Sequence, residues 1–362
     1  MNFVVLRENL RSALDKIKAT IKIVRQFEWS EFVKFEVDPR GITLTGYDLE
    51  TGVIASLDAD TLDSGEFLVN LDKLAALTAK LSGETLECSV DGESMTIKCG
   101  RSNVKIPTRD TEAYPAIPSL DTENRFVIGG ETLSDMIRQT VFAVASADNK
   151  TILQGELFEI ADNRFDLVAI DGYRLAVRTE PVSTADSYSF VVRGDTLRSV
   201  AKLAKGDVTL IPSKRHIIFD FGKTKIFTRL LEGDFHNYKG SIPNRSESTA
   251  IVPVRPLIEC LERFSLLING KLKSPLRCEF GDGKLSMAMK TSLGEMTDYV
   301  DVDFSGKPIT IGFNNQYLLD TLKASESDKV KLELGGAQSP MKAVPLDGNA
   351  YTYLILPVRL KN

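Results

Sequence analysis

The sequence predicts an α+β fold made of three similar domains in tandem, and two sets of repeated passages carry that prediction. In the first set an apolar strand is followed by a helix, a polar break and a second strand. Its equivalent points, Val69, Val192 and Phe313, lie 123 and 121 residues apart. In the second set a strand runs into a helix, and the matching residues lie 123 and 124 positions apart: Leu10, Leu133 and Leu257. A period of this length is typical of tandem domains, because solenoid repeats are far shorter.

Length and linker composition place the domain boundaries. The chain has 362 residues, enough for two or three domains, and a unit of about 120 residues can bury its own core. Prolines interrupt the stretch 111–124, so we expect the first linker at about 117–124. A polar stretch occupies 243–249, where we expect the second linker. The predicted domains are residues 1–121, 122–245 and 246–362.

Each domain is predicted to pack two helices against antiparallel strands. In the first domain, apolar residues at intervals of three and four indicate helices over 8–17 and 71–81. The second helix is expected to bury Leu71, Leu74, Leu77 and Leu81. Strands are predicted at 3–5, 32–37, 42–47, 53–57 and 104–106, with turns at 38–41 and at Asp91-Gly92.

The second domain repeats this order. Residues 125–145 are predicted to form a strand and then a long helix, followed by strands at 156–160, 165–170 and 173–178. Its other helix carries a basic stripe opposite its apolar residues: Arg198, Lys202 and Lys205. No acidic residue interrupts this stripe, so we expect no charge neutralisation within the helix.

Composition indicates a soluble globular protein. Apolar residues make up 43% and charged residues 26% of the chain, and the formal net charge is −5. An acidic balance argues against a general nucleic-acid binder, although basic patches on one surface remain compatible with it. The N-terminus lacks the apolar core of a signal peptide and no apolar run reaches about 20 residues, so we expect a cytoplasmic protein.

The cysteines and histidines do not suggest a metal centre or a catalytic site. Cys88, Cys99, Cys260 and Cys278 show no zinc-ligand spacing and are expected to be buried thiols, with a Cys88–Cys99 disulfide as the alternative. The two histidines, His216 and His236, have no evident partner, and no phosphate-binding loop or nucleophile motif is present. We therefore expect no enzyme activity, no metal and no cofactor.

Six segments in order along the chain resemble the bacterial-type DNA polymerase III beta subunit family, the sliding clamps. They are LTGYDLE (44–50), GRSNVKIPT (100–108), AIDGYRLAV (169–177), FTRLLEGDFHNY (227–238), IGFNNQYLLDTL (311–322) and YLILPVRL (353–360). The resemblance implies the ring-forming DNA clamp fold and a head-to-tail homodimer closed around duplex DNA. It also implies that the replicative polymerase and clamp-loader subunits bind through short linear peptides. The alternative function is a clamp-fold interaction scaffold that does not load on DNA.

The basic faces of the helices are the expected DNA-facing surface. Contacts to phosphates would be independent of base sequence and sensitive to salt, which permits sliding. No aromatic residues are interleaved with these cations, which argues against base stacking. The expected DNA-facing residues are Arg7, Arg11, Lys18, Lys22, Arg25, Lys73, Lys80, Arg138, Lys150, Arg193, Arg198, Lys202 and Lys205.

The resemblance also implies a dimer seam and a peptide pocket. The seam would join the edge strand of the first domain to the third domain through Arg101, Val104, Lys105, Ile106, Leu267, Ile268, Glu295 and Asp298. The alternative for Val104 and Ile106 is a place in the core of the first domain.

The pocket, between the second and third domains, would involve Leu153, Ile170, Gly172, Tyr173, Arg174, Leu175, Asn314, Tyr317, Leu354, Ile355, Leu356, Pro357, Val358, Arg359 and Leu360. We expect polar contacts to the peptide from Arg174, Asn314 and Arg359, although the terminal strand could instead be plain core. The sequence departs from the family at His236, Gly240 and Ser241, which bears on pocket selectivity, and around Arg25, which bears on DNA contacts.

Overall fold

The computed structural model describes residues 1–118, 125–146, 151–184, 186–268 and 274–360. The chain divides into two compact units. The first unit consists of Met1–Ser134 and Ser199–Leu230, and the second of Asp135–Arg198 and Leu231–Asn362. The boundaries fall inside the helices α3 (Gly130–Arg138) and α4 (Gly194–Leu203).

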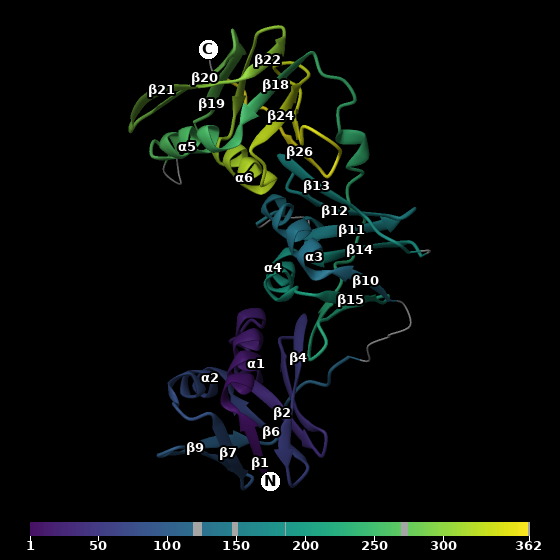
Figure 1. The fold of residues 1–362 in the computed structure, drawn as a ribbon, viewed down its shortest axis with the longest axis vertical. Helices are drawn as coiled ribbons and strands as arrows, with labels where there is room; N and C mark the ends of the chain where they lie inside the picture. Colours follow the sequence, from purple (N-terminus) through teal and green to yellow (C-terminus); the bar gives the residue numbers. More distant parts are fainter. Residues whose placement is uncertain (119–124, 147–150, 185, 269–273, 361–362) are drawn as a thin grey trace. The chain divides into compact units, whose positions relative to one another are not determined.

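The first unit is built on one antiparallel sheet, which has thirteen strands among the described residues (Figure 1). The strand order is β10-β15-β16-β17-β4-β3-β2-β6-β9-β8-β7-β1-β5. The strands are β1 (Asn2–Leu6), β2 (Phe32–Asp38), β3 (Gly41–Tyr47), β4 (Thr51–Leu57), β5 (Ala59–Thr61), β6 (Gly65–Asn70), β7 (Thr85–Val90), β8 (Ser94–Cys99), β9 (Ser102–Arg109), β10 (Phe126–Gly129), β15 (Asp207–Pro212), β16 (His216–Asp220) and β17 (Thr224–Arg229).

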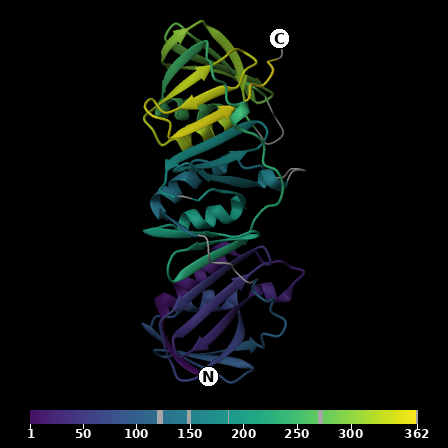
Figure 2. The same ribbon diagram turned by 90° about the vertical axis from the view of Figure 1, so that its right-hand side faces the viewer.

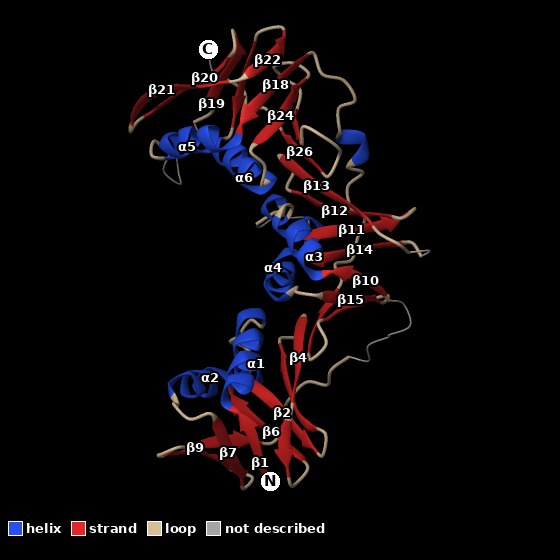
Figure 3. Ribbon diagram, in the orientation of Figure 1, coloured by secondary structure: helices blue, strands red, loops and turns tan. Residues whose placement is uncertain are grey.

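Helices α1 (Arg7–Thr20) and α2 (Leu71–Lys80) lie side by side on one face of this sheet (Figure 3). The apolar stripe of α1 is buried, as its spacing predicts. A Cβ atom on Gly46 of β3 would lie 2.3 Å from Cγ2 of Ile17, so the close packing of α1 on the sheet requires glycine there. The side chain of Asn70 caps α2 by accepting a hydrogen bond from the Lys73 amide at 3.0 Å.

The second unit contains a nine-stranded and a four-stranded antiparallel sheet within its described residues, in the orders β14-β11-β12-β13-β26-β25-β24-β18-β22 and β21-β20-β19-β23. Figure 2 shows β26, in yellow, beside the teal strands with which it forms one sheet. The strands are β11 (Gly155–Ala161), β12 (Arg164–Ile170), β13 (Arg174–Pro181), β14 (Tyr188–Arg193), β18 (Ser248–Pro253), β19 (Leu276–Gly281), β20 (Lys284–Thr291), β21 (Gly294–Asp301), β22 (Asp303–Gly306), β23 (Ile309–Phe313), β24 (Lys329–Leu334), β25 (Met341–Val344) and β26 (Tyr351–Ile355).

Helices α5 (Val254–Ser265) and α6 (Asn315–Ser325) pack against each other in this unit. The buried amide of Asn315 joins them, because its Nδ2 donates to the Leu261 carbonyl at 3.0 Å and to Oγ of Ser265 at 2.9 Å. The core around them includes the fully buried rings of Phe264, Phe313 and Tyr353. Short 3-10 helices occur at Glu28–Glu31, Val141–Ala143, Thr151–Gln154 and Lys239–Ser241.

The structure confirms the predicted repeats and corrects the helix that follows residue 125. In all three copies of the first repeated passage a strand is followed by a helix and then a second strand: β6-α2-β7, β14-α4-β15 and β23-α6-β24. The long helix predicted within 125–145 is wrong, because α3 ends at Arg138 and a 3-10 turn follows. The hydroxyl of Thr140 donates to the carbonyl of Met136 at 2.8 Å and lies 2.5 Å from Oε2 of buried Glu156, and such side-chain bonds compete with helix continuation.

Three smaller predictions also differ from the structure. Leu77 is half-buried, whereas Thr78 occupies the buried face of α2 by donating back to the Leu74 carbonyl. The guanidinium of Arg198 pairs with Asp195 at 3.0 Å, so charge neutralisation within α4 does occur. The alternative of a disulfide is also wrong, because all four cysteines are buried and free. No helix in the described part of the chain has the length and apolarity needed to cross a membrane.

Candidate docking pocket, strand edges and basic surface

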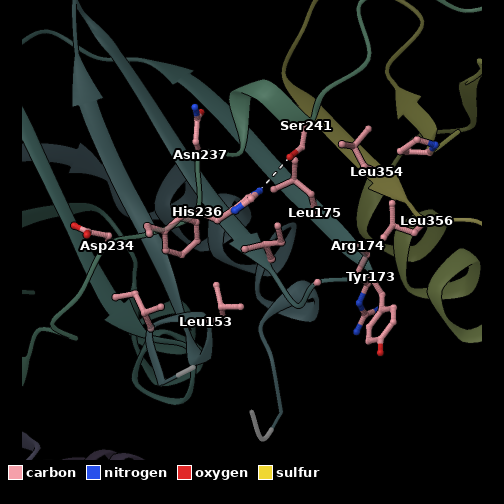
Figure 4. A pocket seen from close by; sticks show the side chains of 15 residues that line it. Leu153, Tyr173, Arg174, Leu175, Asp234, His236, Asn237, Ser241, Leu354 and Leu356 are labelled. Carbon is pink, nitrogen blue, oxygen red and sulfur yellow. Dashed lines mark hydrogen bonds between the residues drawn. The ribbon is translucent and has the colours of Figure 1, made fainter. Parts of the chain in front are cut away.

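A hollow of about 720 Å³ opens in the second unit where the β12–β13 turn meets strand β26 (Figure 4). Most of its lining is aliphatic or aromatic, with a few polar groups, as in pockets that bind apolar peptide anchors. Of the predicted pocket residues, the structure brings these into the lining: Leu153, Ile170, Gly172, Tyr173, Arg174, Leu175, Leu354 and Leu356. The lining residues outside the predicted pocket set are Ile152, Asp234, Phe235, His236, Asn237, Ser241 and Pro340; of these, His236 and Ser241 were expected to affect pocket selectivity.

Backbone pairing holds the floor of this pocket. Leu175 and Leu354 face each other in the β13–β26 register and are both buried. The Leu356 amide donates to the Tyr173 carbonyl at 2.9 Å, which extends the pairing beyond the strand end. Gly172 has a φ of +87°, in the region that favours glycine, and forms the tight turn before Tyr173. The aromatic ring of Tyr173 is left 63% exposed at the pocket mouth.

Arg174 supports the pocket wall through two carboxylates and an aromatic ring. Its Nε lies 2.9 Å from Asp171, its NH1 lies 2.6 Å from Asp320, and its guanidinium stacks 4.5 Å from the ring centre of Tyr317. The side chain is only 12% exposed. Two carboxylates use two of the five N–H donors of this guanidinium, so the expectation that Arg174 offers a polar contact to a peptide stays a prediction.

The remaining predicted pocket residues lie outside this lining. Ile355 is fully buried in the core, and Tyr317 stacks behind Arg174. Asn314 caps α6 by accepting from the Gln316 amide at 2.9 Å. The residues Pro357, Val358, Arg359 and Leu360 follow β26, where the Val358 amide donates to the Gly312 carbonyl and Leu360 packs against Gly312.

A polar wall from residues 234–241 completes the pocket. In Figure 4 the imidazole of His236 points toward Ser241, and its Nε2 lies 3.1 Å from the serine Oγ. The segment lies within and just after the motif FTRLLEGDFHNY. The sequence pointed to this wall only through the departures from the family at His236 and Ser241, which we expected to affect pocket selectivity. It lacks the periodicity of a helix or strand, so its position could not be predicted from pattern.

The corresponding position in the first unit is filled by aromatic side chains. Trp29 lies in the 3-10 helix Glu28–Glu31, which is 123 residues before the one that contains Ile152. The ring of Trp29 contacts Tyr114 with centroids 5.9 Å apart, and Tyr47 contacts Phe227 at 5.4 Å. Because Ile152 is much smaller than Trp29, the matching space in the second unit stays open.

Two strands with exposed edges carry five of the eight residues predicted for the dimer seam: Val104, Lys105 and Ile106 on β9, and Glu295 and Asp298 on β21. Over residues 102–107, β9 pairs with β8 alone among the described strands, and β21 ends its sheet with β20 as its single neighbour. Val104 and Ile106 are half-buried, so the alternative that they form the core is wrong. Leu267 and Ile268 are half-buried beside the core of the second unit. Unpaired strand edges are sites for pairing with another chain.

Charged residues at these edges already have local partners. Lys105 pairs with Asp91 at 3.3 Å, and Asp298 accepts two hydrogen bonds from Arg263. The Arg263 guanidinium beside it lowers the pKa of the Asp298 carboxyl. A third pair joins Lys290 to Glu295 at 3.0 Å. Arg101 is exposed. Apolar contact and strand pairing must therefore supply most of any seam at these edges.

Two strand pairings join consecutive repeats: β4 with β17 and β13 with β26. We call these pairings strand seams, and equivalent residues are paired in both. In β3–β4, Oδ1 of Asp48 accepts from the Thr51 amide at 2.7 Å, and in β12–β13, Oδ1 of Asp171 accepts from the Arg174 amide at 3.0 Å. Thr51 and Arg174 are therefore equivalent, and each pairs with the last strand of the following repeat. Their partners are Thr228 and Ile355.

The predicted DNA-facing residues differ in exposure and in whether they form ion pairs. The exposed ones for which no ion pair is recorded in the described residues are Arg25, Lys73, Lys80, Lys202 and Lys205. Arg11, Lys18, Arg138 and Arg198 are paired with carboxylates, Lys22 is exposed, and Arg193 is half-buried. Lys150 and the linker residues 119–124 lie outside the described residues.

Arg7 has a structural position. Its Nε donates to the Gly83 carbonyl at 2.8 Å and its NH1 to the Thr78 carbonyl at 3.3 Å, at the C-terminal end of α2. The side chain is 17% exposed and also contacts Glu8. These bonds satisfy carbonyls that a helix end leaves open, so the expectation that Arg7 faces DNA is corrected.

Comparison with known proteins agrees with this architecture. Three family models match consecutive segments: the DNA polymerase III beta subunit N-terminal domain at 1–118, its central domain at 127–237 and its C-terminal domain at 239–359. A beta sliding clamp of Streptomyces coelicolor is 30% identical over 336 residues, covering 88% of this chain and 89% of that protein. One from Halalkalibacterium halodurans is 27% identical, covering 99% and 100%. The crystal structure of a putative DNA polymerase III beta subunit from Eubacterium rectale has a TM-score of 0.94 at 26% identity, covering 99% of each chain.

Repeated α+β modules joined through continuous sheets define a DNA clamp. No cluster of three or more His, Cys, Asp or Glu side chains that could hold a metal occurs within the described residues. The chain belongs to the DNA polymerase III beta subunit family, the beta sliding clamps.

Proposed function

We propose that this protein forms a head-to-tail homodimeric ring around duplex DNA in the cytoplasm and tethers the replicative polymerase there without catalysing a reaction. The three domains 1–121, 122–245 and 246–362 are the modules of that ring. The observation that carries the proposal is the recurring strand seam, which leaves β9 and β21 as open edges at the two ends of the repeat series. A seam of the same kind between two copies would use both edges.

The shared register assigns the pairing in this third seam. Gly294 is the residue of β21 that matches Thr51 of β4, because it follows the turn that begins at Thr291 as Thr51 follows the turn that begins at Asp48. In this turn Oγ1 of Thr291 accepts a hydrogen bond from the Leu293 amide. At the other edge, Thr108 in KIPTR matches Thr228 in KIFTR. This register would set Gly294 level with Thr108 of the other copy. Because Thr108 already pairs with Val69 of β6, the new strand pairing would lie along residues 102–107. That places Met296 opposite Ile106, two half-buried apolar side chains.

We expect Ile106→Cys combined with Met296→Cys to give a disulfide-linked dimer under mild oxidation, because opposite residues in antiparallel strands bring their Cβ atoms within about 5.5 Å. Non-reducing gels measure the linked fraction. The native thiols give little background, because burial raises the pKa of Cys88 and Cys260 to about 12.

The matched control is Ile106→Cys with Thr297→Cys, which is shifted by one residue and points the second thiol to the opposite sheet face. Equal crosslinking of the two pairs, or none with the first pair, would refute the assigned register.

The pocket in the second unit supports the tethering role. Its floor of Leu175 and Leu354 and its exposed Tyr173 suit aliphatic and aromatic anchors of a short peptide. The polar wall of His236 and Ser241 can orient such a peptide by hydrogen bonds. We assign this pocket to peptide tails of the replicative polymerase and of clamp-loader subunits.

Charge reversal of exposed lysines tests the role in holding DNA. We expect Lys202→Glu with Lys205→Glu to reduce the protein retained on closed-circular DNA at least about twofold, because repulsion replaces phosphate contacts. Gel filtration of loaded plasmid measures retention, and the difference should shrink at high salt.

The control for this experiment is Lys98→Glu with Lys214→Glu, two exposed residues outside the helices. Release of the wild-type protein on linearising the plasmid shows enclosure. A wild-type protein that never stays on circular DNA after loading would favour the scaffold function.

A further inference from the structure

A second hollow, of about 510 Å³, lies in the first unit and takes no part in the proposed function. It is formed by the 3-10 helix Glu28–Glu31, the β7–β8 turn and the end of β9. Its floor includes the rings of Trp29 and Phe32, and its rim carries Glu28, Glu93, Arg109 and Asp110.

The floor of this hollow already holds a cation over an aromatic ring. The guanidinium carbon of Arg109 lies 4.6 Å from the ring centre of Phe32. Trp29, beside it, is half-buried and stacks on Phe27 with centroids 5.4 Å apart. Exposed aromatic faces attract Lys and Arg side chains through the ring quadrupole, and tryptophan does so best.

The rim has an excess of negative charge. Arg109 pairs with Glu28 at 2.7 Å, and this hydrogen bond lowers the pKa of the Glu28 carboxyl, so these two charges offset each other. Glu93 and Asp110 are exposed, and no ion pair is recorded for either among the described residues. Two carboxylates therefore remain around an aromatic floor, a combination that repels DNA and attracts a cationic ligand.

We propose that this hollow docks a segment of another protein that carries a Lys or Arg side chain next to an apolar one. The cation would lie near the carboxylates of Glu93 and Asp110 and against the part of Trp29 that lines the hollow. The apolar neighbour would contact Ala113 at the edge of the hollow, because Arg109 covers the buried ring of Phe32. This hollow shares no lining residue with the pocket in the second unit.

Trp29 reports on this site directly, because it is the single tryptophan of the chain. The probe is an acetylated hexapeptide of alternating leucine and arginine, and its counterpart has glutamate in place of arginine. We expect the arginine peptide to change Trp29 emission saturably, with a dissociation constant below about 1 mM that rises with salt. The glutamate peptide should give no saturable change.

Variants of the full chain locate the effect. Glu93→Gln with Asp110→Asn should weaken binding of the arginine peptide about fivefold. The charge-matched control, Asp60→Asn with Glu87→Gln, alters two exposed carboxylates elsewhere in the unit and should leave it unchanged. The proposal is overturned by an equal response to both peptides, by equal loss in the control variant, or by calorimetric binding without any change in Trp29 emission. A failed proposed function would instead appear as lost DNA retention with this titration intact.

Discussion

Ile152→Trp is expected to abolish binding of polymerase tail peptides to the pocket of the second unit while the protein stays folded. The matching residue in the first unit is Trp29, which together with Tyr114, Tyr47 and Phe227 fills the corresponding space. An indole at position 152 would occupy the hollow beside Phe235 instead of straining a packed core, since the space is open. We expect affinity to fall at least about 100-fold, or 2.7 kcal/mol.

Fluorescence polarisation with a labelled C-terminal tail peptide of the replicative polymerase measures this loss. Leu62→Trp is the matched control, because Leu62 is 84% exposed in the first unit and its replacement adds the same indole away from the pocket. Circular dichroism of both variants checks the fold. Undiminished affinity in Ile152→Trp would show that peptides bind elsewhere, and the tethering role would lose its site.

Periodicity predicted the strand–helix repeats because their elements bury regular faces, although it made the helix that ends at Arg138 too long. Leu10, Leu133 and Leu257 recur at equivalent points and all three are buried. The strand seams were not predictable in the same way. Thr51 pairs with Thr228, 177 residues later, and nothing in the local pattern of either strand specifies its partner.

The pocket shows the same division between local pattern and long-range contact. Gly172, Tyr173 and Leu354 were found through motifs of the family and do line the hollow. The role of Arg174 was not predictable, because it depends on Asp320, 146 residues away. A sequence motif shows which charged side chains are present. The residues that hydrogen-bond to those side chains are known only from the structure.

Glu156→Gln is expected to remove a pH-dependent loss of stability from the second unit. Glu156 is fully buried on β11, and burial raises the pKa of its carboxyl to about 8, against smaller opposing effects from Thr140 and Arg198. Oε2 lies 2.5 Å from the Thr140 hydroxyl, while no partner is recorded for Oε1 within the described residues. The folded state therefore keeps this proton between pH 4.5 and about 8, where the unfolded chain has lost it.

Because the folded state binds more protons than the unfolded state in that window, this group makes the unit less stable as pH rises. Glutamine has nearly the same shape and stays neutral, so the variant should gain roughly 3 to 5 kcal/mol relative to wild type between pH 5 and pH 9. Calorimetric unfolding at several pH values measures this difference, with Glu259→Gln on the exposed face of α5 as the control. If the difference between wild type and Glu156→Gln stayed constant with pH, the carboxyl would be titrating alike in both states. The buried pair with Thr140 would then bind an ionised group, and Arg198 would have to supply the compensating charge.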